Sequence, residues 1–114
     1  LKTDILTKIA VVGVGNLGRA LLQHNFKRNP NLNITCAFDQ RPDLVGQQLN
    51  GIPIYASQAL TTQIQAAQIT TAILTVPSQV AQTVALELVS AGVTSILNFA
   101  PTRLQLPHQI NVRY

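Results

Sequence analysis

Short apolar runs alternate along the chain with segments whose apolar residues recur at helical spacing. The apolar runs predict strands at about 8–13, 34–39, 52–55, 71–76, 95–99 and 110–114, the last of them cut off by the chain end. The segments between them predict three helices and, from residue 41 to about 49, a short helix or turn. Near-continuous apolar strands are typical of parallel sheets buried on both faces. The pattern therefore predicts an α/β fold, a doubly wound, mostly parallel Rossmann-like sheet of about six strands in the order 3-2-1-4-5-6.

Capping and turn residues mark the ends of the predicted helices. The first helix, at about 16–27, should end at Asn29-Pro30-Asn31, and its apolar stripe should consist of Leu17, Leu21, Leu22 and Phe26. Ser57 and Ser78 can cap the next two helices, and Gly92 can give the last one a left-handed exit. Pro53 predicts an edge position for its strand, since proline donates no ladder hydrogen bond.

With 114 residues the chain is long enough for one domain with its own core. Residues 1–7 have no clear period and are interpreted as a linker or lead-in to a dinucleotide-binding domain at 8–114. No apolar run reaches the ~20 residues of a membrane span, so no membrane role is expected. The single cysteine, Cys36, alternates within a buried strand; it is interpreted as a core residue, and its being alone fits a reducing cytoplasm.

The net charge of +4 and the pI near 9.9 raise the question of nucleic-acid binding. Only Lys27 and Arg28 are adjacent, and no helix carries a basic stripe, so a mildly basic surface is the favoured interpretation. Neither His24 nor His108 has a partner at metal-ligand spacing, and no metal site is predicted.

A glycine-rich turn follows the first predicted strand and precedes the first predicted helix. Gly13 allows the tight turn, Gly15 lets the backbone approach a pyrophosphate, and Gly18 lets the helix pack closely on the sheet. Val14, Asn16 and Leu17 complete the loop. The first N–H groups of the helix would bind the phosphate, because they lack partners and lie at the positive end of the helix dipole.

Asp39 ends the second predicted strand, about 20 residues after the last glycine, where a carboxylate can accept both hydroxyls of an adenosine ribose. Such a carboxylate repels a 2′-phosphate, which favours NAD over NADP. Arg41 leaves that choice open, since a guanidinium nearby can accommodate the phosphate.

The ligand crevice should lie between the carboxyl ends of the first and fourth strands. Its second half should be lined by the segments that end the fourth and fifth strands, Thr75-Val76-Pro77 and Asn98-Phe99-Ala100-Pro101. Tyr55 can reach the rim or pack at the sheet edge. The predicted carboxyl edge has no His, Lys or Cys placed for acid–base or nucleophilic chemistry, so no catalytic residue is predicted.

With these segments in place, the chain from about Lys8 to Tyr114 resembles the central NAD(H)-binding, CoA-binding-type domain of the Rex redox-sensing transcriptional repressors. The resemblance rests on Val12 to Leu21, Ala37-Phe38-Asp39, Ile73 to Pro77, and Gly92 with Ile96 to Pro101. It implies a sensor and no enzyme: a homodimer in which NADH, preferred over NAD⁺, promotes release of operator DNA. It also implies that Gly13, Gly15 and Gly18 hold the pyrophosphate, Asp39 the adenosine ribose, and Thr75, Val76, Pro77, Asn98, Ala100, Pro101 and Tyr55 the nicotinamide half.

The chain departs from this family in two respects. It lacks the winged helix that binds DNA and the C-terminal helix that swaps between protomers, so it resembles an excised domain, expected to be a weak dimer or a monomer. Arg41 stands where the family more often has an acid. Two other functions remain open: the cofactor half of an NAD-dependent dehydrogenase, and a CoA-binding module of the CoA-ligase type.

Overall fold

The structure is a computed structural model that describes residues 7–24 and 32–114. Seven strands form one sheet: β1 (Thr7–Val12), β2 (Leu32–Asp39), β3 (Gln48–Leu49), β4 (Ile52–Ala56), β5 (Thr71–Leu74), β6 (Ser95–Asn98) and β7 (Asn111–Arg113). The helices are α1 (Asn16–His24), the 3₁₀ turn η2 (Ser57–Ala59), α2 (Leu60–Ala67) and α3 (Ser78–Ala91). The expected end of the first helix at 29–31, Phe26 in its stripe and residues 1–6 of the lead-in lie outside the described residues.

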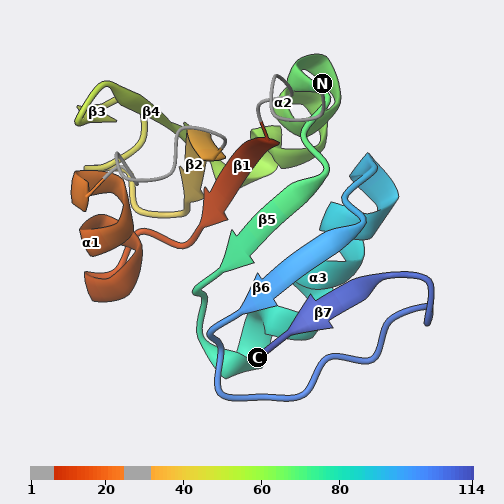
Figure 1. Ribbon diagram of the computed structural model, residues 1–114. Coiled ribbons are helices and arrows are strands. Elements are labelled where there is room, and N and C mark those ends of the chain that lie inside the picture. Colours follow the sequence, from red (N-terminus) through yellow and green to blue (C-terminus); the bar gives the residue numbers. More distant parts are fainter. Residues whose placement is uncertain (1–6, 25–31) are drawn as a thin grey trace.

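The strand order β3-β4-β2-β1-β5-β6-β7 confirms the predicted topology (Figure 1). Without β3, it is the expected order 3-2-1-4-5-6, and every pairing within it is parallel. The order reverses between β1 and β5, and the connections that leave their carboxyl ends lead to helices on opposite faces of the sheet, α1 and α3. The fold therefore provides the crevice that the sequence predicts.

The prediction of an edge position for Pro53 was wrong. A two-residue strand, β3, lies outside β4 and pairs with it antiparallel, with Gln48 opposite Pro53. The tight turn between them uses positive φ at both central residues, 56° at Asn50 and 79° at Gly51. Such a turn matches the twist of the flanking strands, so a hairpin forms although β3 is very short.

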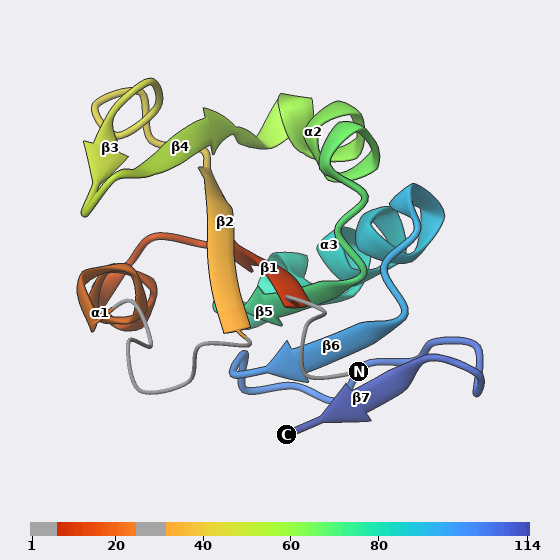
Figure 2. The same ribbon diagram turned by 45° about the horizontal axis from the view of Figure 1, so that its top comes forward.

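Two hydrophobic cores lie on opposite faces of the sheet. In Figure 2, α1 covers one face, while α2 and α3 cover the other. Alternate residues of β1 supply both cores: Val11 packs on the face that holds Leu22 of α1, and Val12 on the face that holds Ile64 and Leu88. This period of two follows from the alternating direction of side chains along a strand. Burial on both faces explains why the strands are almost entirely apolar.

Neither predicted serine cap forms. Ser57 opens the 3₁₀ turn η2, and Ser78 is the first residue of α3; neither helix start has a side-chain capping hydrogen bond. Pro77 occupies the N-cap position of α3 with extended backbone angles (φ −60°, ψ 152°), so Ser78 lies one residue too late to cap. The C-terminal prediction for α3 is confirmed, because Gly92 adopts the left-handed conformation at φ 113°. None of the described helices is long and apolar enough to cross a membrane.

Candidate functional site

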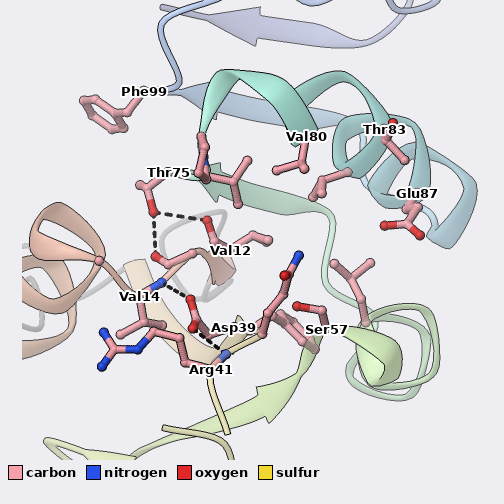
Figure 3. A pocket seen from close by; sticks show the side chains of 18 of the residues that line it. Val12, Val14, Asp39, Arg41, Ser57, Thr75, Val80, Thr83, Glu87 and Phe99 are labelled. Atoms are coloured by element: carbon pink, nitrogen blue, oxygen red, sulfur yellow. Dashed lines mark hydrogen bonds between the residues drawn. The ribbon is translucent and has the colours of Figure 1, made fainter. Parts of the chain in front are cut away.

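A cavity of about 1150 Å³ opens at the carboxyl ends of β1, β2, β5 and β6 (Figure 3). Of the predicted site residues, it is lined by Gly13, Val14, Gly15, Leu17, Asp39, Arg41, Thr75, Val76, Pro77 and Pro101. Asn16, Gly18, Tyr55, Asn98 and Ala100 do not line it. Pockets for drug-sized molecules measure roughly 300–1,000 Å³, so this cavity is large enough for a small-molecule ligand of at least that size.

Gly13 and Gly18 are required by the packing of the loop itself. Gly13 has φ 100°, and a Cβ there would lie 2.8 Å from Oγ1 of Thr75. A Cβ on Gly18 would overlap the carbonyl oxygen of Gly13 and lie 3.2 Å from the same hydroxyl. The start of α1 thus packs directly against the loop, with no room for a side chain between them.

Gly15 differs from the other two glycines, because nothing lies within 4 Å of the position that its Cβ would occupy. It is exposed, it lines the cavity, and its carbonyl accepts the first hydrogen bond of α1, from the Arg19 N–H at 2.8 Å. Leu17 was expected in the buried stripe of α1, yet it is 42% exposed and faces the cavity. The outer side of the loop is therefore open to a ligand.

Thr75 joins the glycine loop to the other half of the site. Its hydroxyl lies 2.5 Å from the carbonyl oxygen of Gly13 and 3.1 Å from that of Val12, and its N–H donates to Val12 at 2.8 Å. These contacts, drawn in part in Figure 3, use the hydroxyl proton within the protein. Thr75 thus fixes the loop against β5 while it lines the cavity.

Asp39 is half-buried at the end of β2 and bridges two segments of the rim. One carboxylate oxygen accepts the N–H of Val14 at 2.8 Å, and the other accepts the N–H of Arg41 at 3.0 Å. A carboxylate has about four acceptor positions, so two remain for hydroxyl groups of a ligand. The carboxylate is thus held in place by the glycine loop at the point where the sequence predicts a ribose.

Arg41 lies at the rim beside Asp39 and forms an exposed ion pair with Asp43. Its Nη2 is 2.8 Å from Oδ2 of Asp43, and the two side chains are 58% and 65% exposed. The hydrogen bond from Arg41 lowers the pKa of Asp43, and the nearby charges of Arg41 and Arg19 add to that effect. Asp43 itself does not line the cavity.

Asn98 and Ala100 were expected to face the ligand, but neither lines the cavity: Asn98 ends β6, and Ala100 lies in the turn that follows. Asn98 is only 3% exposed; its amide donates to the Thr102 carbonyl at 2.9 Å and accepts the Ala100 N–H at 3.0 Å. A buried amide needs such partners, and here the backbone supplies them. Phe99 lies between them in the chain; it lines the cavity, as expected of this segment, and is 47% exposed.

The sequence analysis did not predict one wall of the cavity. Val80, Thr83, Val84 and Glu87 of α3 line it at helical spacing, together with Ser57, Gln58 and Leu60 from η2 and α2. Helical spacing places Val80 and Val84 on one stripe of α3 and Ala81 and Ala85 on the next, but it does not say which stripe faces the core. Ala81 and Ala85 are fully buried in the core, and this leaves Val80 and Val84 for the cavity.

Tyr55 and Cys36 lie behind the cavity. The Tyr55 ring packs against that of Phe38, with centroids 5.9 Å apart, and it is Phe38 that reaches the cavity. Cys36 is buried on β2, and burial raises the pKa of its thiol to about 12. Its interpretation as a core residue is confirmed. Within residues 7–24 and 32–114, no three His, Cys, Asp or Glu side chains are grouped to hold a metal ion.

Known proteins resemble this chain over almost its full length. The Rex redox-sensing transcriptional repressor of Latilactobacillus sakei subsp. sakei (strain 23K) is 69% identical over 114 residues, 100% of this chain and 55% of that protein. The crystal structure of RSP, a Rex-family repressor, in complex with β-NADH has a TM-score of 0.91 at 28% identity and covers 99% of this chain and 55% of that one. RSP with β-NAD⁺ and operator DNA gives 0.90 at 28% identity, covering 96% of this chain and 51% of that one.

The chain spans about half the length of the curated relatives that it matches. A family model described as the CoA binding domain matches residues 4–102, and it includes the glycine loop, β2 with Asp39, and the strands β5 and β6. The chain therefore belongs to the CoA-binding domain family, and its similarity to the Rex repressors extends over its whole length.

Proposed function

We propose that this chain is the NAD(H)-sensing domain of a redox-responsive transcriptional repressor, in which NADH binding promotes release of operator DNA by the full-length dimer. The observation that carries the proposal is the carboxylate of Asp39, held by the N–H of Val14 beside the open face of Gly15. The named ligands of the related RSP structures, β-NADH, β-NAD⁺ and operator DNA, support it.

The proposed pose runs across the switch point of the sheet. The pyrophosphate would lie over Gly15 at the first N–H groups of α1, and the adenosine ribose would bond Asp39. The adenine would then extend toward the wall formed by Leu60, Val80 and Val84. The nicotinamide would occupy the half of the cavity at β5 and β6, which is lined by Thr75, Val76, Pro77, Phe99 and Pro101.

Charge on the nicotinamide ring provides the redox signal. The ring of NAD⁺ is a cation and that of NADH is neutral, so walls such as Val76, Pro77 and Pro101 would penalise the desolvation of NAD⁺ more. NADH should therefore bind more tightly. Release of DNA further requires two arrangements of the dimer for which NADH has different affinities. The role is one of sensing without catalysis, in a cytoplasm that contains both the cofactor pool and the DNA.

A titration of this chain with NADH, NAD⁺, NADPH and CoA tests the proposal. The chain has no Trp, so nicotinamide fluorescence is little obscured, and calorimetry provides a second readout. NADH should bind, NAD⁺ should bind more weakly, and CoA should leave the melting temperature unchanged. A preference for NAD⁺ over NADH would contradict the redox mechanism.

A CoA-binding module is the second candidate, favoured by the description of the matching family. The same cavity would then hold the nucleotide part of CoA. In that case CoA would raise the melting temperature and NADH would not, so the titration separates the two functions.

A further inference from the structure

In the proposed pose, Arg41 lies at the adenosine end of the cavity. Among the described residues that line the cavity, it is the only lysine or arginine. Its backbone N–H donates to Asp39 at 3.0 Å, so the base of the side chain is fixed next to the carboxylate proposed to hold the ribose. A guanidinium rooted there can reach a 2′-phosphate and bond it through two N–H groups.

In the structure, however, the Arg41 guanidinium is paired with Asp43. Its Nη2 donates to Oδ2 of Asp43 at 2.8 Å, and Figure 3 shows the side chain extending past Val14, away from Ser57. An aspartate with the ordinary pKa of 3.8 is already ionised at neutral pH, and the hydrogen bond from Arg41, with the charge of Arg19, lowers the pKa of Asp43 further. The charge of Arg41 is thus neutralised by a residue that does not itself line the cavity.

We propose that Asp43 is a specificity-determining residue for the cofactor: it pairs with Arg41 at 2.8 Å and so makes the site select a ribose with a free 2′-hydroxyl. The inference rests on the proposed function, because it assumes that the ribose lies at Asp39. Asp39 then repels a 2′-phosphate, and Arg41, the one cation among the described residues that line the cavity, is occupied by Asp43. Without Asp43, Arg41 could turn to the phosphate and offset the repulsion from Asp39.

The size of the effect follows from the exposure of the pair. Solvent-exposed ion pairs are weak and change an equilibrium constant by at most about fivefold. Replacement of Asp43 should therefore improve NADPH binding about fivefold relative to NADH binding. Because the contact is exposed, the gain should shrink as the salt concentration rises from about 0.05 M to about 0.5 M, which shortens the Debye length from roughly 14 Å to roughly 4 Å.

The test compares dissociation constants for NADPH and NADH in the wild-type chain, in Asp43→Asn and in the double variant Arg41→Gln/Asp43→Asn. The single variant should raise NADPH affinity relative to NADH, and the double variant should lose that gain, since the gain acts through Arg41. Asp43→Glu, which keeps the charge, is the matched control and should behave like the wild type. Retained NADH binding in each variant reports an intact fold.

The failures are distinguishable. If the wild-type chain binds neither dinucleotide, the proposed function is wrong. If it binds NADH but Asp43→Asn leaves the NADPH-to-NADH ratio unchanged, or if the gain persists in the double variant, the proposed function stands and the role of Asp43 is overturned.

Discussion

Strands β2 and β6 end in turns of the same local chemistry, with opposite consequences for the site. Asp39 accepts the N–H of Arg41 two residues on, and Asn98 accepts the N–H of Ala100 two residues on, both at 3.0 Å. Asp39 is half-buried and lines the cavity, whereas Asn98 is buried and its amide also donates to Thr102. A strand-end side chain therefore becomes a candidate ligand only where acceptor positions are left facing the cavity.

The largest effect is expected from the loop that anchors Asp39. Gly18→Ala would push a methyl group into the carbonyl of Gly13, so we expect the free energy of unfolding to fall by about 3 kcal/mol. Gly15→Ala is the matched control: its Cβ meets nothing within 4 Å, so its main effect should be weaker NADH binding. Urea denaturation measures the first change and fluorescence titration the second. Equal stability losses in both variants would mean that the loop is not packed as described.

The second effect concerns the Asp39 turn itself. Asp39→Ala should weaken NADH binding by about 1–3 kcal/mol, because two ribose hydroxyls lose their acceptor. Calorimetric titration gives the affinity directly. Asp39→Asn keeps the shape but replaces one acceptor with a donor, so it should fall between the wild type and Asp39→Ala. An Asp39→Ala chain that binds NADH as the wild type does would return attention to CoA as the ligand.

Replacement of Asn98 should affect folding stability more than NADH binding. Asn98→Ala leaves the buried Ala100 N–H and the Thr102 carbonyl without their partner, so the free energy of unfolding should fall by about 1–2 kcal/mol. Its loss of NADH affinity should be smaller than that of Asp39→Ala. Chemical denaturation and titration of the same two variants give both values. The contrast between the turns fails if Asn98→Ala weakens NADH binding more than it destabilises the fold.

The smallest effect concerns the buried part of β2 that leads to Asp39. Cys36 should react slowly with a thiol reagent at pH 8, because its raised pKa keeps the folded thiol protonated. Burial raises the pKa of the folded thiol from its ordinary value of 9.0 to about 12, so this contribution to stability is retained below pH 9 and declines as the pH rises toward about 12. Cys36→Ala should lack this part of the decline when unfolding is followed against pH. Rapid labelling of the folded wild type would show that β2 opens.

The sequence predicted those parts of the fold and of the site that depend on apolar periodicity and on the spacing between motifs. Apolar periodicity located the strands, and the turn before α1 together with the distance to Asp39 located the adenosine half. The sequence could not show which stripe of α3 faces the core, since the valines and the alanines are both apolar. In the structure the small alanines pack close to the sheet, and Val80 and Val84 line the cavity. It also could not assign Asn98, because its partners are backbone groups of a turn whose shape depends on packing.

The tip of the β3–β4 hairpin holds the C-terminal end of α1 in place. The Asn50 amide donates to the carbonyls of Leu22 and Gln23, both at 3.2 Å, and the other end of α1 is fixed where Gly18 meets Gly13. The helix is thus clamped at both ends before any ligand arrives. Its N-terminal donors are preorganised, so an anion would bind there with little loss of conformational entropy.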